Sequence, residues 1–277
     1  MGERELHPEL SPNYYALWPG YLLRYGGFVL SFATIILGYL SNTQILTALG
    51  IVILAITIFL FWAARWVTRR RYAIEQLEVI ELLYRMSQAG PEDDLAYVDL
   101  GLRAPAIALS RHLTTGQLTV IDVFNPRLTG NKELSNARRQ APSVLVDPRL
   151  DWYDSHIDLL PLPDSSVAAV FLPLVLSEFN QEGDRYSLLR EIKRILRPGG
   201  RLLVAEQNTS WLNWLSLNPG PSKLQPFTHW QNLLTQAGFQ LLRQEELHGL
   251  SVCMRADKPS PFAGIQLALK LDFQSLS

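Results

Sequence analysis

Cysteine and histidine are scarce in this sequence. Cys253 is the only cysteine among 277 residues, which excludes an internal disulfide and a zinc site built from several cysteines. The 5 histidines are scattered, without HxxxH or a similar spacing, so we expect no metal site. An excess of either charge is also missing. The net charge of -1 gives no reason to expect nucleic acid as a partner.

Charge is absent altogether from one long stretch, between Tyr25 and Ala64. The stretch is long enough for two helices of about 20 residues, each crossing a hydrocarbon core roughly 30 Å thick. Its only consecutive polar run, residues 41–44, marks the break. We predict a two-helix transmembrane hairpin over residues 21–67, with the lipid bilayer as its partner. Two buried core helices fit less well, because such helices are seldom this apolar on every face.

Basic residues flank this stretch and are missing from its turn. Arg24 precedes it, and four arginines follow within residues 65–71. The positive-inside rule then predicts that both termini lie on the cytoplasmic side. A solvated helix face is the alternative for these arginines, but their place directly after a span favours contact with anionic headgroups. The N-terminal tail, residues 1–20, lacks the basic region and cleavage site of a secretory signal.

The remaining composition suits a protein that is partly membrane-embedded and partly soluble, with 48% hydrophobic and 18% charged residues. Residues 72–86 carry apolar and charged positions at helical spacing. We predict an amphipathic linker helix within residues 68–92, covering one edge of the domain that follows. That domain spans residues 93–256, and residues 257–277 form a C-terminal tail.

The predicted domain opens with a βαβ unit. Strand-like patterns occur at residues 97–100 and 118–123, separated by a glycine-containing turn and a helical segment, residues 105–113. In a doubly wound sheet a ligand binds where the first strand meets the helix, and an acid at the tip of the second strand accepts hydrogen bonds from ribose hydroxyls. Asp122 holds that place.

Asp99, Gly101 and Asp122 resemble the first two motifs of class I S-adenosylmethionine-dependent methyltransferases, whose glycine-rich turn often reads DxGxGxG. Here the turn reads DLGLRAP, with Arg103 and Pro105 in place of two glycines. The resemblance implies S-adenosylmethionine as cofactor, bound at Asp99, Gly101 and Asp122. Arg103 either blocks the place of the cofactor or pairs with the carboxylate of the cofactor.

Residues 150–179 resemble the third and fourth motifs of the family. His156 falls where the family has the aspartate that contacts adenine, and Ala168 falls where it has another acid. Asp154 or Asp158 could instead bind the adenine amino group. Residues 184–207 and 227–247 match the family's later helices and strands. The resemblance therefore implies a seven-stranded, doubly wound, Rossmann-like α/β domain behind the helical hairpin.

Residues 208–227 contain a run of tryptophan and leucine that, in the family, often lies over the acceptor. Its amphipathic aromatic character suits a lipophilic acceptor or a membrane surface. A hydrophobic loop folded onto its own domain is the alternative.

Two functions follow. One is methyl transfer from S-adenosylmethionine to a lipophilic acceptor such as a quinone, a pigment precursor or a lipid. A general base is needed only for a hydroxyl of high pKa, and His156, Glu178 and Glu206 are the candidates. The other is a catalytically inactive, methyltransferase-like subunit with a structural or assembly role in a membrane protein complex, motivated by Arg103 and Pro105.

Overall fold

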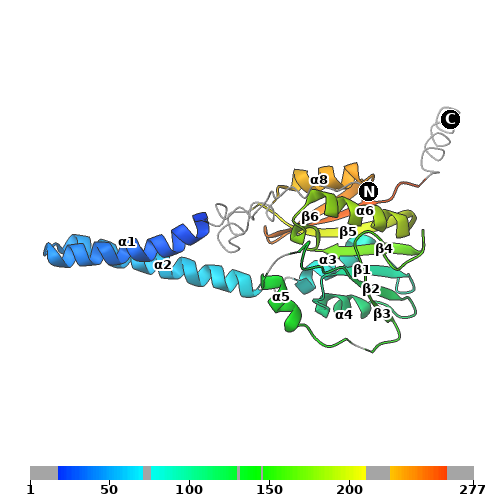
Figure 1. Ribbon diagram of the computed structural model, residues 1–277, viewed down its shortest axis with the longest axis horizontal. Coiled ribbons are helices and arrows are strands. Elements are labelled where there is room, and N and C mark those ends of the chain that lie inside the picture. Colours follow the sequence, from blue (N-terminus) through cyan, green and yellow to red (C-terminus); the bar gives the residue numbers. More distant parts are fainter. Residues whose placement is uncertain (1–17, 71–75, 130–131, 145, 210–224, 261–277) are drawn as a thin grey trace, which may run out of the picture. The chain divides into compact units, whose positions relative to one another are not determined.

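The computed structural model describes residues 18–70, 76–129, 132–144, 146–209 and 225–260 (Figure 1). The chain forms two compact units, one containing the N-terminal helices and the other containing a β-sheet, and the division between them falls at residues 72 and 73. The described helices are α1 (Trp18–Leu40), α2 (Gln44–Arg70), α3 (Gln76–Ser87), α4 (Ala104–Ser110), α5 (Lys132–Arg139), η3 (Leu176–Glu178), α6 (Glu182–Ile195) and α8 (Phe227–Gln236).

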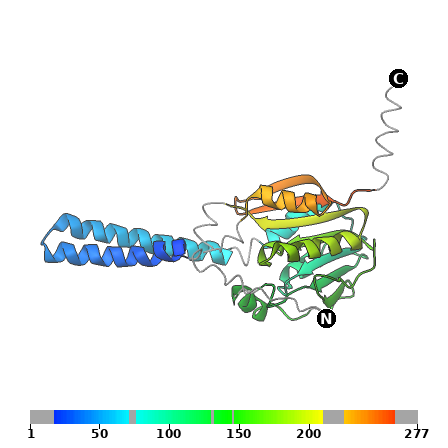
Figure 2. The ribbon, with the colours of Figure 1, turned by 45° about the horizontal axis from the view of Figure 1, so that its top comes forward.

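The first unit contains the predicted helical hairpin. α1 and α2 pack along each other and are joined by a turn at the polar run that the sequence marked (Figure 2). Glycine permits the close approach: a Cβ on Gly38 would lie 2.5 Å from the backbone nitrogen of Thr47, and one on Gly50 would lie 2.6 Å from Cγ1 of Ile35. The two helices and the position of the break are therefore confirmed.

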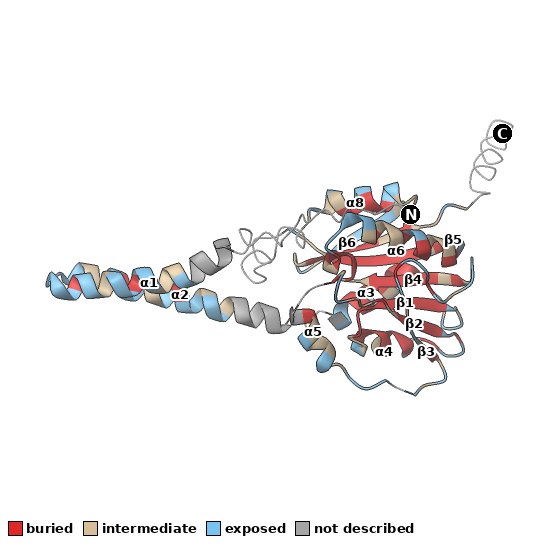
Figure 3. Ribbon diagram, in the orientation of Figure 1, coloured by how far each residue is buried: buried red, intermediate tan, exposed pale blue. Residues whose placement is uncertain are grey.

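The membrane assignment of this hairpin is supported only in part. One described helical segment, Gln44–Ala63, is long and apolar enough to cross a membrane, with a mean hydropathy of 2.7. The apolar described part of α1, Tyr25–Leu40, is shorter. Large apolar side chains of both helices are exposed, as on Phe32 and Phe59. Figure 3 shows that much of α1 and α2 is coloured as exposed. The second span and the orientation of the hairpin stay predictions.

The second unit is built on one sheet of seven strands. The strands are β1 (Leu95–Asp99), β2 (Leu118–Asp122), β3 (Leu150–Asp154), β4 (Val167–Pro173), β5 (Leu196–Gln207), β6 (Gln240–Leu247) and β7 (Ser251–Asp257). Their order is β3-β2-β1-β4-β5-β7-β6; the first five pair in parallel and β7 is antiparallel to both neighbours. The predicted seven-stranded Rossmann-like fold is confirmed as a mixed sheet.

Helices cover both faces of this sheet (Figures 1 and 2). On one face α6 and α8 contribute buried side chains such as Leu188, Ile192 and Trp230 to the first core cluster. On the other face α3 and α4 contribute Leu83 and Leu109 to the second cluster, which also holds the buried Cys253 of β7. The central strands β1, β2 and β4 are nearly continuous apolar runs, as expected when both faces are buried.

The predicted linker helix, α3, is an integral part of the domain. Its apolar stripe is buried on the sheet through Val79, Ile80, Leu82, Leu83 and Met86. At its carboxyl end, the guanidinium Nη1 of Arg201 donates to the carbonyl of Ser87 at 2.9 Å, and that of Arg255 donates to the carbonyl of Met86 at 3.1 Å. Cations at this end of a helix are stabilising. The domain thus begins before residue 93, because α3 completes its core.

Several other boundaries differ from the sequence predictions. The helix predicted for residues 105–113 ends at Ser110. β7 extends to Asp257, one residue beyond the predicted end of the domain. The tryptophan-rich run, residues 211–217, lies outside the described residues, as do most of both predicted tails.

Candidate cofactor site

Three carboxylates stand side by side at the carboxyl ends of the first strands. Asp99 of β1 pairs in register with Asp122 of β2, and Asp122 pairs in register with Asp154 of β3. This edge of a parallel sheet is where ligands bind in doubly wound folds. The structure therefore brings together three of the predicted site residues.

Asp99 shapes the turn that follows β1. Its Oδ1 accepts hydrogen bonds from the backbone N–H of Leu100 at 2.8 Å and of Leu102 at 3.2 Å, and its Oδ2 accepts one from the N–H of Arg103 at 3.0 Å. Burial raises the pKa of Asp99, and the hydrogen bond from Arg103 opposes that shift. The carboxylate thus organises the turn from within and is committed to the backbone.

Arg103 and Pro105 are accommodated at the start of α4. Arg103 adopts φ 63°, in the left-handed region that a glycine would enter without strain. Pro105 lies in the first turn of the helix, where its missing N–H costs nothing. The Nη1 of Arg103 donates to the carbonyl of Pro142 at 3.1 Å. A contact of Arg103 with the cofactor carboxylate stays a prediction.

Arg138 of α5 fills the space beside Gly101. Gly101 has φ 79°, and a Cβ built on it would lie 1.9 Å from Nη1 of Arg138. The same Nη1 donates to Asp122 Oδ2 at 2.7 Å, to Asp122 Oδ1 at 2.9 Å and to the carbonyl of Leu100 at 2.5 Å. The guanidinium also lies 4.1 Å from the ring centre of Phe124. The sequence analysis also expected an arginine to affect this site, but it identified Arg103 and not Arg138.

These observations test whether S-adenosylmethionine fits. The donor set is suitable, since Asp122 can accept hydrogen bonds from ribose hydroxyls and Gly101 leaves room for a ligand. The room is taken, however, because Arg138 binds both oxygens of Asp122 and occupies the space beside Gly101. In this conformation the cofactor does not fit, and it requires Arg138 to move.

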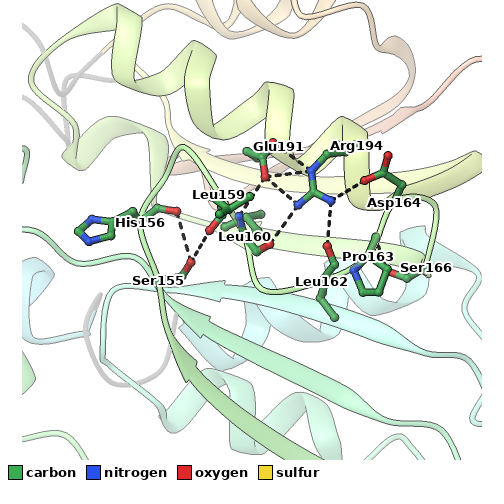
Figure 4. Close-up of polar contacts among 10 residues, drawn as sticks. All are labelled: Ser155, His156, Leu159, Leu160, Leu162, Pro163, Asp164, Ser166, Glu191 and Arg194. Carbon is green, nitrogen blue, oxygen red and sulfur yellow. Dashed lines mark hydrogen bonds and ion pairs between the residues drawn. The ribbon is translucent and has the colours of Figure 1, made fainter.

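The segment after β3 is fixed from α6 (Figure 4). The guanidinium of Arg194 donates to the carbonyls of Leu160 at 3.0 Å and Leu162 at 2.9 Å, and it forms an ion pair with Glu191 at 2.8 Å. Glu191 in turn accepts from the N–H of Leu160 at 3.0 Å. Figure 4 shows the ring of His156 pointing away from this network. The loop is therefore held by its backbone, which leaves the ring of His156 outside the network.

The candidates for contact with adenine and for general base differ in accessibility. Asp154, His156 and Asp158 are exposed. Glu206 is completely buried at the end of β5, where it accepts from the N–H of Leu176 at 2.7 Å and of Ser177 at 3.3 Å.

Burial raises the pKa of Glu206 to about 7, against the hydrogen bonds from Ser177 and Leu176 and the charge of Arg185. Glu206 thus fixes the segment after β4 that carries the partly exposed Glu178. The role of either glutamate as a base stays a prediction.

Sequence reasoning missed a charged cluster near Glu206. Arg185 of α6 is 4% exposed, donates to the carbonyl of Phe179 at 2.9 Å and lies 3.3 Å from Nε2 of His229. Burial lowers the pKa of both Arg185 and His229. The signal for Arg185 was available, because its spacing places it on the same helix face as Leu188 and Ile192.

The sheet order, the turn after β1 and the acid at the tip of β2 resemble those of the class I methyltransferase fold. Residues 100–204 match the family described as a methyltransferase domain. Over these residues the chain is similar to that family.

Solved structures agree on the fold. An S-adenosylmethionine-dependent methyltransferase from Aquifex aeolicus is 19% identical with a TM-score of 0.54, over 68% of this chain and 93% of that one. Human N-acetylserotonin methyltransferase, solved with S-adenosylmethionine, is 19% identical with a TM-score of 0.50, over 68% of this chain and 53% of that one. A search of curated protein sequences finds no match.

Proposed function

We propose that this protein is a membrane-anchored methyltransferase that transfers a methyl group from S-adenosylmethionine to a lipophilic acceptor such as a quinone, a pigment precursor or a lipid. The observation that carries the proposal is the pairing of Gly101 with Asp122, whose Oδ2 lies 2.9 Å from the place of a Cβ on Gly101. In this arrangement an acid borders a turn residue that has no side chain, as ribose recognition requires.

The roles of the site residues follow from their positions. Asp122 accepts hydrogen bonds from the ribose hydroxyls, Gly101 leaves space for the ligand, and Asp99 holds the turn through backbone amides. Asp154 or Asp158 contacts the adenine amino group, since both are exposed and Asp154 pairs in register with Asp122 at this sheet edge. Arg103 lies two residues after Gly101, so its guanidinium can reach the amino-acid part of the cofactor.

The lipophilic acceptor is supported by the helical hairpin. Residues 21–67 anchor the chain in the bilayer, with both termini and the methyltransferase domain on the cytoplasmic side. The exposed apolar side chains of α1 and α2 support this assignment, because a water-exposed surface of this kind is costly. A reporter fused to either terminus should score cytoplasmic, and opposite locations of the two reporters would mean a single span.

The direct test is calorimetric titration of S-adenosylmethionine into the purified full chain in detergent, for the wild type and for Arg138→Ala. Binding by at least one of the two supports the proposal, and methyl transfer from labelled cofactor into a lipid extract would then identify the acceptor class. Failure of both proteins to bind contradicts it.

One observation favours a second function. The space beside Gly101 is filled by Arg138, as it would be in a domain that has lost its cofactor and serves a structural or assembly role in a membrane protein complex. Such a subunit would bind no S-adenosylmethionine with or without Arg138. The same titration therefore separates the two functions.

A further inference from the structure

The contact of Arg138 with Asp122 and Leu100, here called the Arg138 latch, is more specific than an ordinary surface ion pair. Three acceptor atoms converge on one nitrogen, Nη1, at 2.5 to 2.9 Å. The two side chains are largely covered, with 26% of Arg138 and 16% of Asp122 exposed. The guanidinium also stacks over Phe124. Charge-assisted hydrogen bonds of this kind are stronger than those between neutral groups.

The latch and a cofactor need the same atoms. A ribose held by Asp122 must approach its two carboxylate oxygens, and both already accept hydrogen bonds from Arg138. The ligand must also pass beside Gly101, where Nη1 of Arg138 occupies the space that a side chain on residue 101 would fill. Simultaneous binding is therefore excluded by space as well as by hydrogen bonding.

The element that carries Arg138 is suited to movement. α5 has eight residues, and among its described side chains only Leu134 is buried. A helix held by one buried side chain loses little apolar contact when it shifts. The end of α5 carries a second arginine, Arg139, which is exposed.

We infer that Arg138 closes the cofactor site, and that an adenosine-containing ligand binds only when α5 withdraws Arg138 from Asp122. The identity of the ligand rests on the proposed function, whereas the latch itself is a property of the chain without ligand. The latch makes the site self-occluding. The apparent cofactor affinity of the wild type is the affinity of the open form multiplied by the fraction of molecules in which the latch is open.

The first test needs no ligand. Thermal unfolding of the full chain in detergent is compared for Arg138→Ala, Asp122→Asn and the double variant. A closed latch predicts non-additive effects, because the second substitution removes a contact already lost. Additive effects would show that the two side chains do not interact and would overturn the inference.

The second test measures competition by titrating S-adenosylmethionine into the same proteins. Arg138→Ala should bind about tenfold more tightly than the wild type, the scale of one charge-assisted hydrogen bond. Arg139→Ala is the matched control, since it removes the same charge from the same helix, and it should bind like the wild type. Equal or weaker binding by Arg138→Ala overturns the latch while leaving the proposed function intact.

A conformational readout completes the design. Addition of S-adenosylmethionine to the wild type should increase amide hydrogen exchange across α5, because binding releases the helix. In Arg138→Ala the exchange should already be fast before the cofactor is added. If neither the wild type nor Arg138→Ala binds S-adenosylmethionine, both the proposed function and the competition between Arg138 and the cofactor are overturned. The unfolding comparison then tests only the contact between Arg138 and Asp122.

Discussion

Asp122 accepts hydrogen bonds from Arg138 at the place where a ribose would bind, so its contribution to affinity is best measured once Arg138 is removed. Compared with Arg138→Ala, the double variant Arg138→Ala/Asp122→Ala should bind S-adenosylmethionine at least about tenfold more weakly, because it loses hydrogen bonds to a charged acceptor worth about 1.5 to 3 kcal/mol each. Titration calorimetry measures the difference. Unchanged affinity would reject the proposed ribose contact.

Glu206 makes the stability of the domain depend on pH. Burial raises its pKa to about 7 from an ordinary value of 4.5, so the folded chain retains a proton that the unfolded chain releases between these values. Its contribution to stability is complete below pH 4.5 and is lost as the pH rises through 7. Glu206→Gln should flatten this fall, by up to about 3 kcal/mol.

Chemical denaturation between pH 4.5 and 8.5 tests this dependence. Glu182→Gln, the same change at an exposed carboxylate, provides the control. An identical pH dependence in wild type and Glu206→Gln would mean that Glu206 does not retain its proton on folding.

At the scale of elements, α6 fixes the loop after β3 through Arg194. Replacing Arg194 with Met keeps the apolar stem but removes the hydrogen bonds to Leu160 and Leu162, and it leaves Glu191 without its partner. We expect a loss of about 2 kcal/mol in unfolding free energy. Residues 155–166 should also exchange their amide hydrogens faster. Arg190→Met, at an exposed site on the same helix, should change neither quantity.

The strands and the turn were predictable because their signals are local. Continuous apolar runs mark the central strands β1, β2 and β4, and Asp99 with Gly101 marks the turn within a few residues. The Arg138 latch is different, since Arg138 lies 16 residues from Asp122 and 38 from Leu100. In sequence α5 is simply a polar helix, and nothing in its composition indicates which of its arginines reaches the sheet.

At the scale of the whole molecule, α3 decides where the soluble unit begins. A fragment of residues 73–277 should fold and stay in the supernatant at high salt, because it keeps the helix that covers the sheet. A fragment of residues 93–277 should aggregate, since the apolar face beneath Val79 and Leu83 is then uncovered.

Gel filtration and circular dichroism compare these fragments. Equal stability of the two fragments would mean that α3 is only a linker. A longer fragment that pellets with membranes would mean either that the anchor lies elsewhere or that residues 211–217 provide a second one.

The buried thiol of Cys253 makes opening of the sheet measurable. Cys253 is fully buried in β7, paired with Ala205 of β5 on one side and with Glu245 of β6 on the other. A thiol reagent reaches it only when these strands separate, so the labelling rate counts openings of the domain. Because the chain has no other cysteine, the full protein can be followed in a lipid bilayer, where the hairpin contributes no background and no probe has to be engineered.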